Sequence, residues 1–129
     1  MIAKKKRLWI GLALLGVVCA AAYPLWSAWQ NYLEKEKEKR AKADIVVIEE
    51  ATKIWNENYG SFPPCLEVLA EPQPNGDPAV IDKRMLVDPW GQNYVYDSSS
   101  ILGSLGRDPH IYSQGPPGQG KFISNRFKD

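Results

Sequence analysis

The chain has 129 residues and a net charge of +1, which leaves room for one small domain once the apolar N-terminal segment is set aside. The charge is unevenly distributed: residues 1–42 carry nine Lys/Arg against three Glu, and residues 43–129 carry seven Lys/Arg against twelve Asp/Glu. Phosphate recognition needs clustered cations. A C-terminal part with a net charge of −5 therefore argues against nucleic-acid binding.

An uncharged run from Leu8 to Trp29 is the only apolar segment long enough to cross a bilayer. At a helical rise of about 1.5 Å per residue it would span about 33 Å, close to the thickness of a hydrocarbon core. Basic residues precede the run and aromatic residues lie at both ends, which is typical of a single-pass anchor with a cytoplasmic N-terminus. We expect a bacterial inner-membrane protein with a periplasmic C-terminal domain. The predicted anchor residues are Lys4, Lys5, Lys6, Arg7, Trp9, Pro24, Trp26 and Trp29.

A cleaved signal peptide is the alternative interpretation of this segment. The basic tip, the apolar run and a cleavage site at Ala20-Ala21-Ala22 fit the three regions of such a peptide. Against cleavage, the apolar pattern continues through Pro24 to Trp26. Pro24 removes one backbone donor, so we expect a kink in the helix there.

Residues 34–60 are predicted to form a helical stalk outside the membrane. Glu and Lys alternate at its start, with favourable i,i+4 pairs. Beyond them, apolar residues recur at spacings of four and three, which indicates one buried helix face. Gly60 and the following Pro63-Pro64 predict the end of the helix, which we expect to begin near Leu8. The face comprises Ala41, Ile45, Ile48, Thr52, Trp55 and Tyr59, widened by Val47, Ala51 and Ile54.

Residues 61–129 are predicted to form a small C-terminal domain. The chain is thus expected to have three parts, with the basic tip and membrane helix in residues 1–33 and the stalk in residues 34–60. Three short strands are expected at residues 93–97, 110–113 and 122–124, and one helical turn at residues 66–70. Asp88 is expected to cap the turn at Pro89. Three short strands are not stable alone, so we expect them to pack on Ile45, Ile48 and Trp55.

Catalytic and cofactor sites find no support in the sequence. His110 is the only histidine and has no Cys or His partner at ligand spacing. Neither a glycine-rich phosphate loop nor a recognisable carboxylate pair is present, so we expect no enzyme, no cofactor and no small-molecule substrate. Cys19 is interpreted as an apolar packing residue. Cys65 is either half-buried or available for an intermolecular bridge.

Several local motifs resemble the major pseudopilin of the type II secretion system. The segment from Asp88-Pro89-Trp90-Gly91 to Tyr94 resembles the family's most specific local signature. It lies in register with a Tyr-Gly-x-Phe-Pro turn before it and an Ile-Tyr-Ser strand after it. The similar segments are Leu15-Gly16-Val17 with Pro24, Ala43-Asp44-Ile45, Ile48-Glu49, Asn58 to Pro63, Asp88 to Tyr94, and Ile111 to Gly115.

The resemblance implies a pilin-like α+β fold, in which a long N-terminal helix packs on a small three-stranded antiparallel sheet. It implies a structural subunit whose apolar helix enters the core of a short filament. The expected partners are the membrane, other copies of the chain and further pseudopilin or envelope-complex subunits. Two alternatives stay open: an accessory or adaptor subunit of another envelope complex, and a secreted or periplasmic binding domain released by signal peptidase. The residues expected to carry structure and interaction are Ile45, Ile48, Trp55, Gly60, Asp88, Pro89, Trp90 and Gly91.

Two features depart from the family's pattern. Family members carry a leader ending in glycine, then phenylalanine and, four residues on, a glutamate needed for processing and assembly. Aligned on Pro24, Arg7 takes the place of that glutamate. The family also binds calcium in its last loop through two aspartates and backbone carbonyls. Here Pro117 takes the place of the first aspartate, and the second falls near Ser124 and Asn125. We expect a divergent member without the processing site or the calcium site, and with a loop stiffened by prolines.

Overall fold

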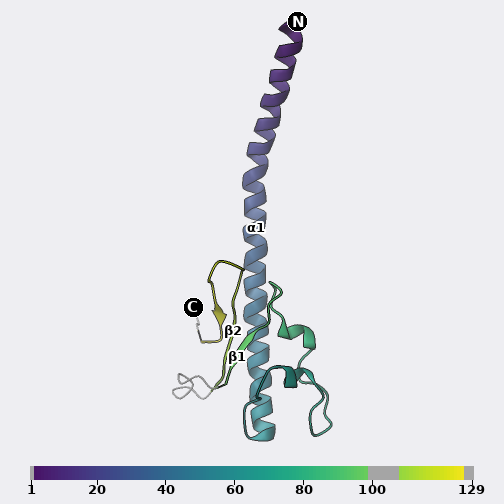
Figure 1. Cartoon of the computed structure of the whole chain (residues 1–129), viewed down its shortest axis with the longest axis vertical. Coiled ribbons are helices and arrows are strands. Elements are labelled where there is room, and N and C mark those ends of the chain that lie inside the picture. The colour runs from purple at the N-terminus through teal and green to yellow at the C-terminus, as the bar shows by residue number, and fades with distance from the viewer. Residues whose placement is uncertain (1, 99–107, 127–129) are drawn as a thin grey trace. The chain divides into compact units, whose positions relative to one another are not determined.

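A computed structural model describes residues 2–98 and 108–126 (Figure 1). The chain divides into two compact units, residues 1–36 and 37–129. Helix α1 (Ile2–Tyr59) runs through both units and includes Pro24. The helix begins earlier than the expected start near Leu8, because the basic residues before the apolar run are good helix formers. It ends where expected: Gly60 has φ +75° and its amide donates to the carbonyl of Asn56 over 2.8 Å.

The second unit contains a three-stranded antiparallel sheet in the order β1-β2-β3. Strand β1 (Val95–Asp97) pairs with β2 (His110–Ser113), and β2 pairs with β3 (Ile123–Ser124). Two residues expected in the first strand precede it, and Asn93 forms only an isolated bridge with Val87. One long helix with a small antiparallel sheet confirms the predicted α+β, pilin-like fold class.

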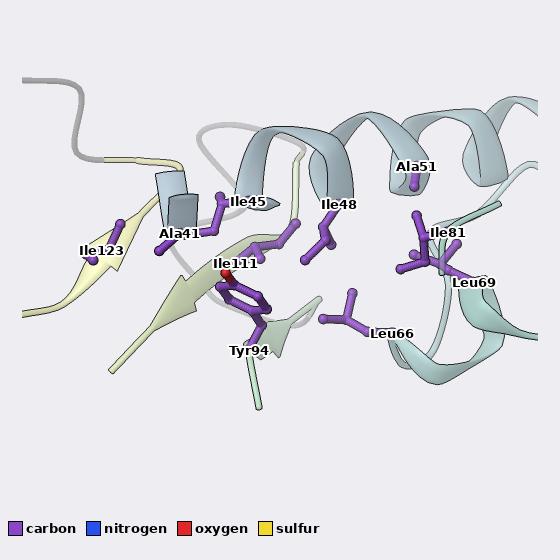
Figure 2. Packing of buried hydrophobic residues seen from close by; sticks show 10 residues of the cluster. All are labelled: Ala41, Ile45, Ile48, Ala51, Leu66, Leu69, Ile81, Tyr94, Ile111 and Ile123. Atoms are coloured by element: carbon purple, nitrogen blue, oxygen red, sulfur yellow. The ribbon is translucent and has the colours of Figure 1, made fainter. Parts of the chain in front are cut away.

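The core of the second unit lies between the sheet and the part of α1 beyond residue 37. Along β2 the side chains alternate, so that Ile111 and Ser113 are buried while His110 and Tyr112 are half-buried. Figure 2 shows Ile123 near the Ala41 end of the helix and Leu69 and Ile81 near the Ala51 end. The buried apolar residues are Ala41, Ile45, Ile48, Ala51, Leu66, Leu69, Ile81, Tyr94, Ile111 and Ile123.

The buried face of α1 is narrower than expected. Ala51 belongs to it, whereas Val47 and Ile54 are 45% and 44% exposed, so their predicted place in the core is wrong. Each helical residue is rotated by about 100° from the next. This rotation carries Val47 away from the face centred on Ile48, and a sheet of three short strands does not reach around the helix to cover it.

Two 3₁₀ helices connect α1 to the sheet. The first, η1 (Glu67–Ala70), matches the expected turn, and its Leu69 carbonyl accepts the amides of Val80 (2.9 Å) and Ile81 (3.1 Å). The second, η2 (Lys83–Leu86), was not expected from the sequence. Its N-cap is Asp82, whose side chain accepts the Arg84 amide. The Leu69 pairings hold η1 against the segment that precedes η2, and η1 and η2 contact each other.

Candidate functional site

The Asp88-Pro89-Trp90-Gly91 segment is a closed turn organised by one carboxylate. Asp88 is buried, and its Oδ1 accepts the amides of Trp90 (3.0 Å) and Gln92 (2.8 Å). The Gly91 amide donates to the Asp88 carbonyl over 3.0 Å, and Gly91 has φ +83°, which favours glycine. The Asp88 amide also donates to the Gln92 carbonyl over 2.7 Å, so four hydrogen bonds within five residues fix the path of the chain into β1.

The same carboxylate also joins the turn to the sheet. Ser113, fully buried at the end of β2, donates its hydroxyl to Asp88 Oδ2 over 2.6 Å. The Gly115 amide then donates to the Ser113 Oγ over 3.0 Å. A buried carboxylate that accepts several donors is well satisfied without a cation. Asp88 thus connects its own turn, β2 and the loop after β2.

The remaining turn residues contribute contacts rather than chemistry. Trp90 packs against the buried cluster, and Pro89 is half-buried beside it in the chain. On the helix, Ile45 and Ile48 are buried, whereas Trp55 is half-buried and packs against the cluster. The ring centroids of Trp55 and Tyr59 lie 4.4 Å apart. These positions form a packing surface with no reactive group.

Two tyrosine hydroxyls form hydrogen bonds that the sequence did not predict. One joins the sheet region to α1, and the other joins it to the segment that follows α1. The Tyr94 hydroxyl donates to Asp44 Oδ2 over 3.0 Å, and Arg40 lies 3.8 Å from the same carboxylate. The Tyr96 hydroxyl donates to the Pro63 carbonyl over 2.7 Å. Burial raises the pKa of both phenols, that of Tyr96 to about 12, and the Asp44 carboxylate adds to the effect at Tyr94. Both hydroxyls therefore stay protonated and act as donors.

The predicted anchor residues all lie on α1 in the first unit. The four basic residues and the three tryptophans are exposed. The Ser27 hydroxyl donates to the Pro24 carbonyl over 3.0 Å, and the rings of Trp29 and Tyr32 are 6.1 Å apart. Within the part of the chain that the structure describes, α1 is the one helix long and apolar enough to cross a membrane. This geometry fits a single-pass anchor.

The described residues contain no group of three or more His, Cys, Asp or Glu side chains that could hold a metal ion. His110 Nε2 lies 2.7 Å from Ser124 Oγ, and burial together with the Arg126 guanidinium lowers the pKa of His110. Cys19 is exposed and Cys65 is half-buried, and both are free thiols.

A protein-family model described as type II secretion system (T2SS), protein G, matches residues 29–122. The match spans the stalk part of α1, the Asp88 turn, and strands β1 and β2. No curated protein matches the chain, so the assignment depends on this model and on the motifs that it covers. Because the matched segment is well over half of the sequence, the chain belongs to the type II secretion system protein G family, the major pseudopilins.

Proposed function

We propose that the chain is a non-enzymatic, membrane-anchored structural subunit of a pseudopilin assembly related to type II secretion. The observation that supports this proposal is that α1 has apolar side chains both on a face that its own domain buries and on a face that stays exposed. In the second unit the domain's own sheet covers Ile45 and Ile48, yet Val46, Val47 and Ile54 stay exposed. Exposed apolar side chains on an ordered helix are typical of an interaction surface.

The first unit supports the same proposal with a larger surface. Large apolar side chains are exposed at many positions from Leu8 to Leu33, on every side of the helix. A helix that is apolar all round needs lipid or other helices as its surroundings. The basic residues before the run favour a cytoplasmic N-terminus and a periplasmic C-terminal unit. We infer that the first unit exchanges lipid contacts for contacts with other subunits during assembly.

Site-specific photocrosslinking in cells tests this function. A photoreactive phenylalanine analogue replaces Val47, and a matched variant carries it at Glu71, an exposed residue of the loop after η1. We expect irradiation of the Val47 variant to produce a ladder at multiples of the chain's mass, with far less product from the Glu71 variant. Equal yields from both positions would contradict assembly through this face of α1.

An adaptor subunit of another envelope complex is the second candidate, and the basic tip favours it. Lys4, Lys5, Lys6 and Arg7 are exposed on the first turns of α1, and the family places a glutamate at Arg7. Transferring each unpaired cation into an apolar filament core would cost several kcal/mol. In the crosslinking experiment an adaptor would give one product of fixed mass with a different protein. The intact mass of the protein from membranes would show whether residues 1–22 are retained.

A further inference from the structure

The loop between β2 and β3, residues 114–122, is the loop in which the pseudopilin family binds calcium. Calcium takes six to eight oxygen ligands, usually including carboxylates. Residues 109–126 contain no Asp or Glu. The donor set of this loop therefore offers no charged oxygen from its own side chains.

The polar side chains at the second aspartate's position are already engaged within the protein. Ser124 Oγ lies 2.7 Å from His110 Nε2 and accepts the Arg126 amide over 3.1 Å. Asn125 Oδ1 accepts the Ile111 amide over 3.2 Å, and its Nδ2 donates to the Pro109 carbonyl over 3.2 Å. These hydrogen bonds join the end of β3 to the start of β2 and occupy the polar atoms of both side chains. The side chains present do not fit a calcium ion.

A protein cation lies in this loop instead. The Lys121 ammonium contacts Glu38 Oε1 over 2.5 Å, and the two residues are 83 positions apart in the chain. The Glu38 side chain is 25% exposed and that of Lys121 is 55% exposed, so the pair is partly shielded from water. Its carboxylate belongs to α1, and so the pair fastens the loop to the helix.

The backbone of the loop is closed by short contacts near the same lysine. Gly115 has φ +71°, and a Cβ at this position would collide with the carbonyl oxygen of Lys121. The Gly115 amide donates to the Ser113 Oγ, and the Gln119 amide donates to the carbonyl of the buried Pro116 over 3.3 Å. The two ends of the loop therefore meet directly, with no space between Gly115 and Lys121 for an ion.

We infer that the Lys121–Glu38 ion pair closes the C-terminal loop in place of a calcium ion, so that the second unit folds independently of calcium. In this chain the loop carries the positive charge of Lys121, which Glu38 of α1 neutralises. In the family the positive charge is that of a calcium ion, which carboxylates of the loop neutralise. The loop should then respond to charge reversal and to salt, which screens exposed pairs, and not to chelators. This inference concerns folding and does not depend on the proposed assembly.

Hydrogen exchange of the full-length protein in detergent micelles, read by mass spectrometry on peptides from residues 114–122, tests the inference. We expect unchanged exchange and a melting temperature within about 1 °C in calcium chloride and in EDTA. Lys121→Glu should speed exchange of the loop about fivefold, since a partly exposed ion pair contributes at most about that factor. High salt should speed exchange of the wild-type loop in the same direction.

Two further variants make the result specific. The reciprocal pair Glu38→Lys with Lys121→Glu should restore slow exchange, because it regenerates the contact with the charges swapped. Lys53→Glu disrupts another ion pair of α1, with Glu49 at 3.0 Å, and should leave the loop unchanged. A lower melting temperature in EDTA that calcium reverses would overturn the inference. So would unchanged loop exchange in Lys121→Glu, or no rescue by the swapped pair.

Discussion

The two parts of helix α1 differ in how their apolar side chains are distributed. Before residue 34, apolar residues occupy every side of the helix and are exposed. After residue 37, they are buried on one face, as at Ile45 and Ile48, and exposed on the next, as at Val46 and Val47. The periodicity of apolar residues, more than their number, therefore shows which part of a helix packs in its own domain and which part needs other surroundings.

The largest expected loss of stability comes from a substitution in the buried face of α1 after residue 37. Ile48→Asp removes a fully buried side chain and places an unpaired carboxylate in the core, which should cost more than about 4 kcal/mol of unfolding free energy. That loss approaches the whole stability of a small domain. Near-ultraviolet circular dichroism of the protein in micelles should show that tertiary structure is lost. Val47→Asp, one residue away and exposed, should stay within about 0.5 kcal/mol of wild type; similar losses in the two variants would refute the one-sided packing of α1.

The second prediction concerns the part of α1 before residue 34. Leu14→Arg places a cation near the middle of the apolar run and should disfavour membrane insertion by about 3 kcal/mol. Carbonate extraction of membranes should release more of this variant, while thermal unfolding of the second unit stays unchanged. Leu33→Arg, at the end of the segment, should have a smaller effect because its side chain reaches the headgroups. Equal extraction of the two variants would argue against a transmembrane position for this run.

The third prediction concerns the sheet that covers the buried face of α1. This face needs a sheet in a fixed position to pack against. Asp88→Asn keeps the size of the side chain but cannot accept from all three donors at once. The unfolding free energy should fall by about 2 kcal/mol, measured by urea denaturation. Asp82→Asn is the matched control, since this exposed carboxylate also accepts a backbone amide. A loss no greater than that of the control would show that burial of Asp88 is unimportant.

Local patterns predicted much of this fold. The end of α1 follows from Gly60, its buried face from the spacing of Ile45 and Ile48, and strand β2 from its β-forming residues Ile111 and Tyr112. The sequence also indicated that Asp88 belongs to a turn, because Asp before Pro is typical of turn initiation. These features depend on neighbours within a few residues, where spacing and backbone preference are informative.

The contacts that connect distant segments could not be predicted in this way. Asp88 meets Ser113 across 25 residues, Asp44 meets Tyr94 across 50, and Glu38 meets Lys121 across 83. No local pattern specifies such partners, since the geometry of the packed sheet brings them together. The inward position of Ser113, two residues after Ile111 on β2, was the one available signal that it would need a buried partner.

The smallest expected loss of stability comes from removing one of the polar contacts around the buried face of α1. The Tyr96 hydroxyl donates to the carbonyl of Pro63, and burial raises the pKa of Tyr96 to about 12, against about 10 for an unperturbed tyrosine. A folded-state pKa above the unfolded one means that this contribution to stability is complete below about pH 10 and is lost as the pH rises towards about 12. The melting temperature should therefore fall over this interval.

In Tyr96→Phe the unfolding free energy should be about 1 kcal/mol lower at neutral pH, and the fall of the melting temperature at alkaline pH should be shallower. Tyr23→Phe, which alters an exposed side chain of the first unit, should reproduce the wild-type profile; an equally steep fall in Tyr96→Phe would show that another group controls alkaline unfolding.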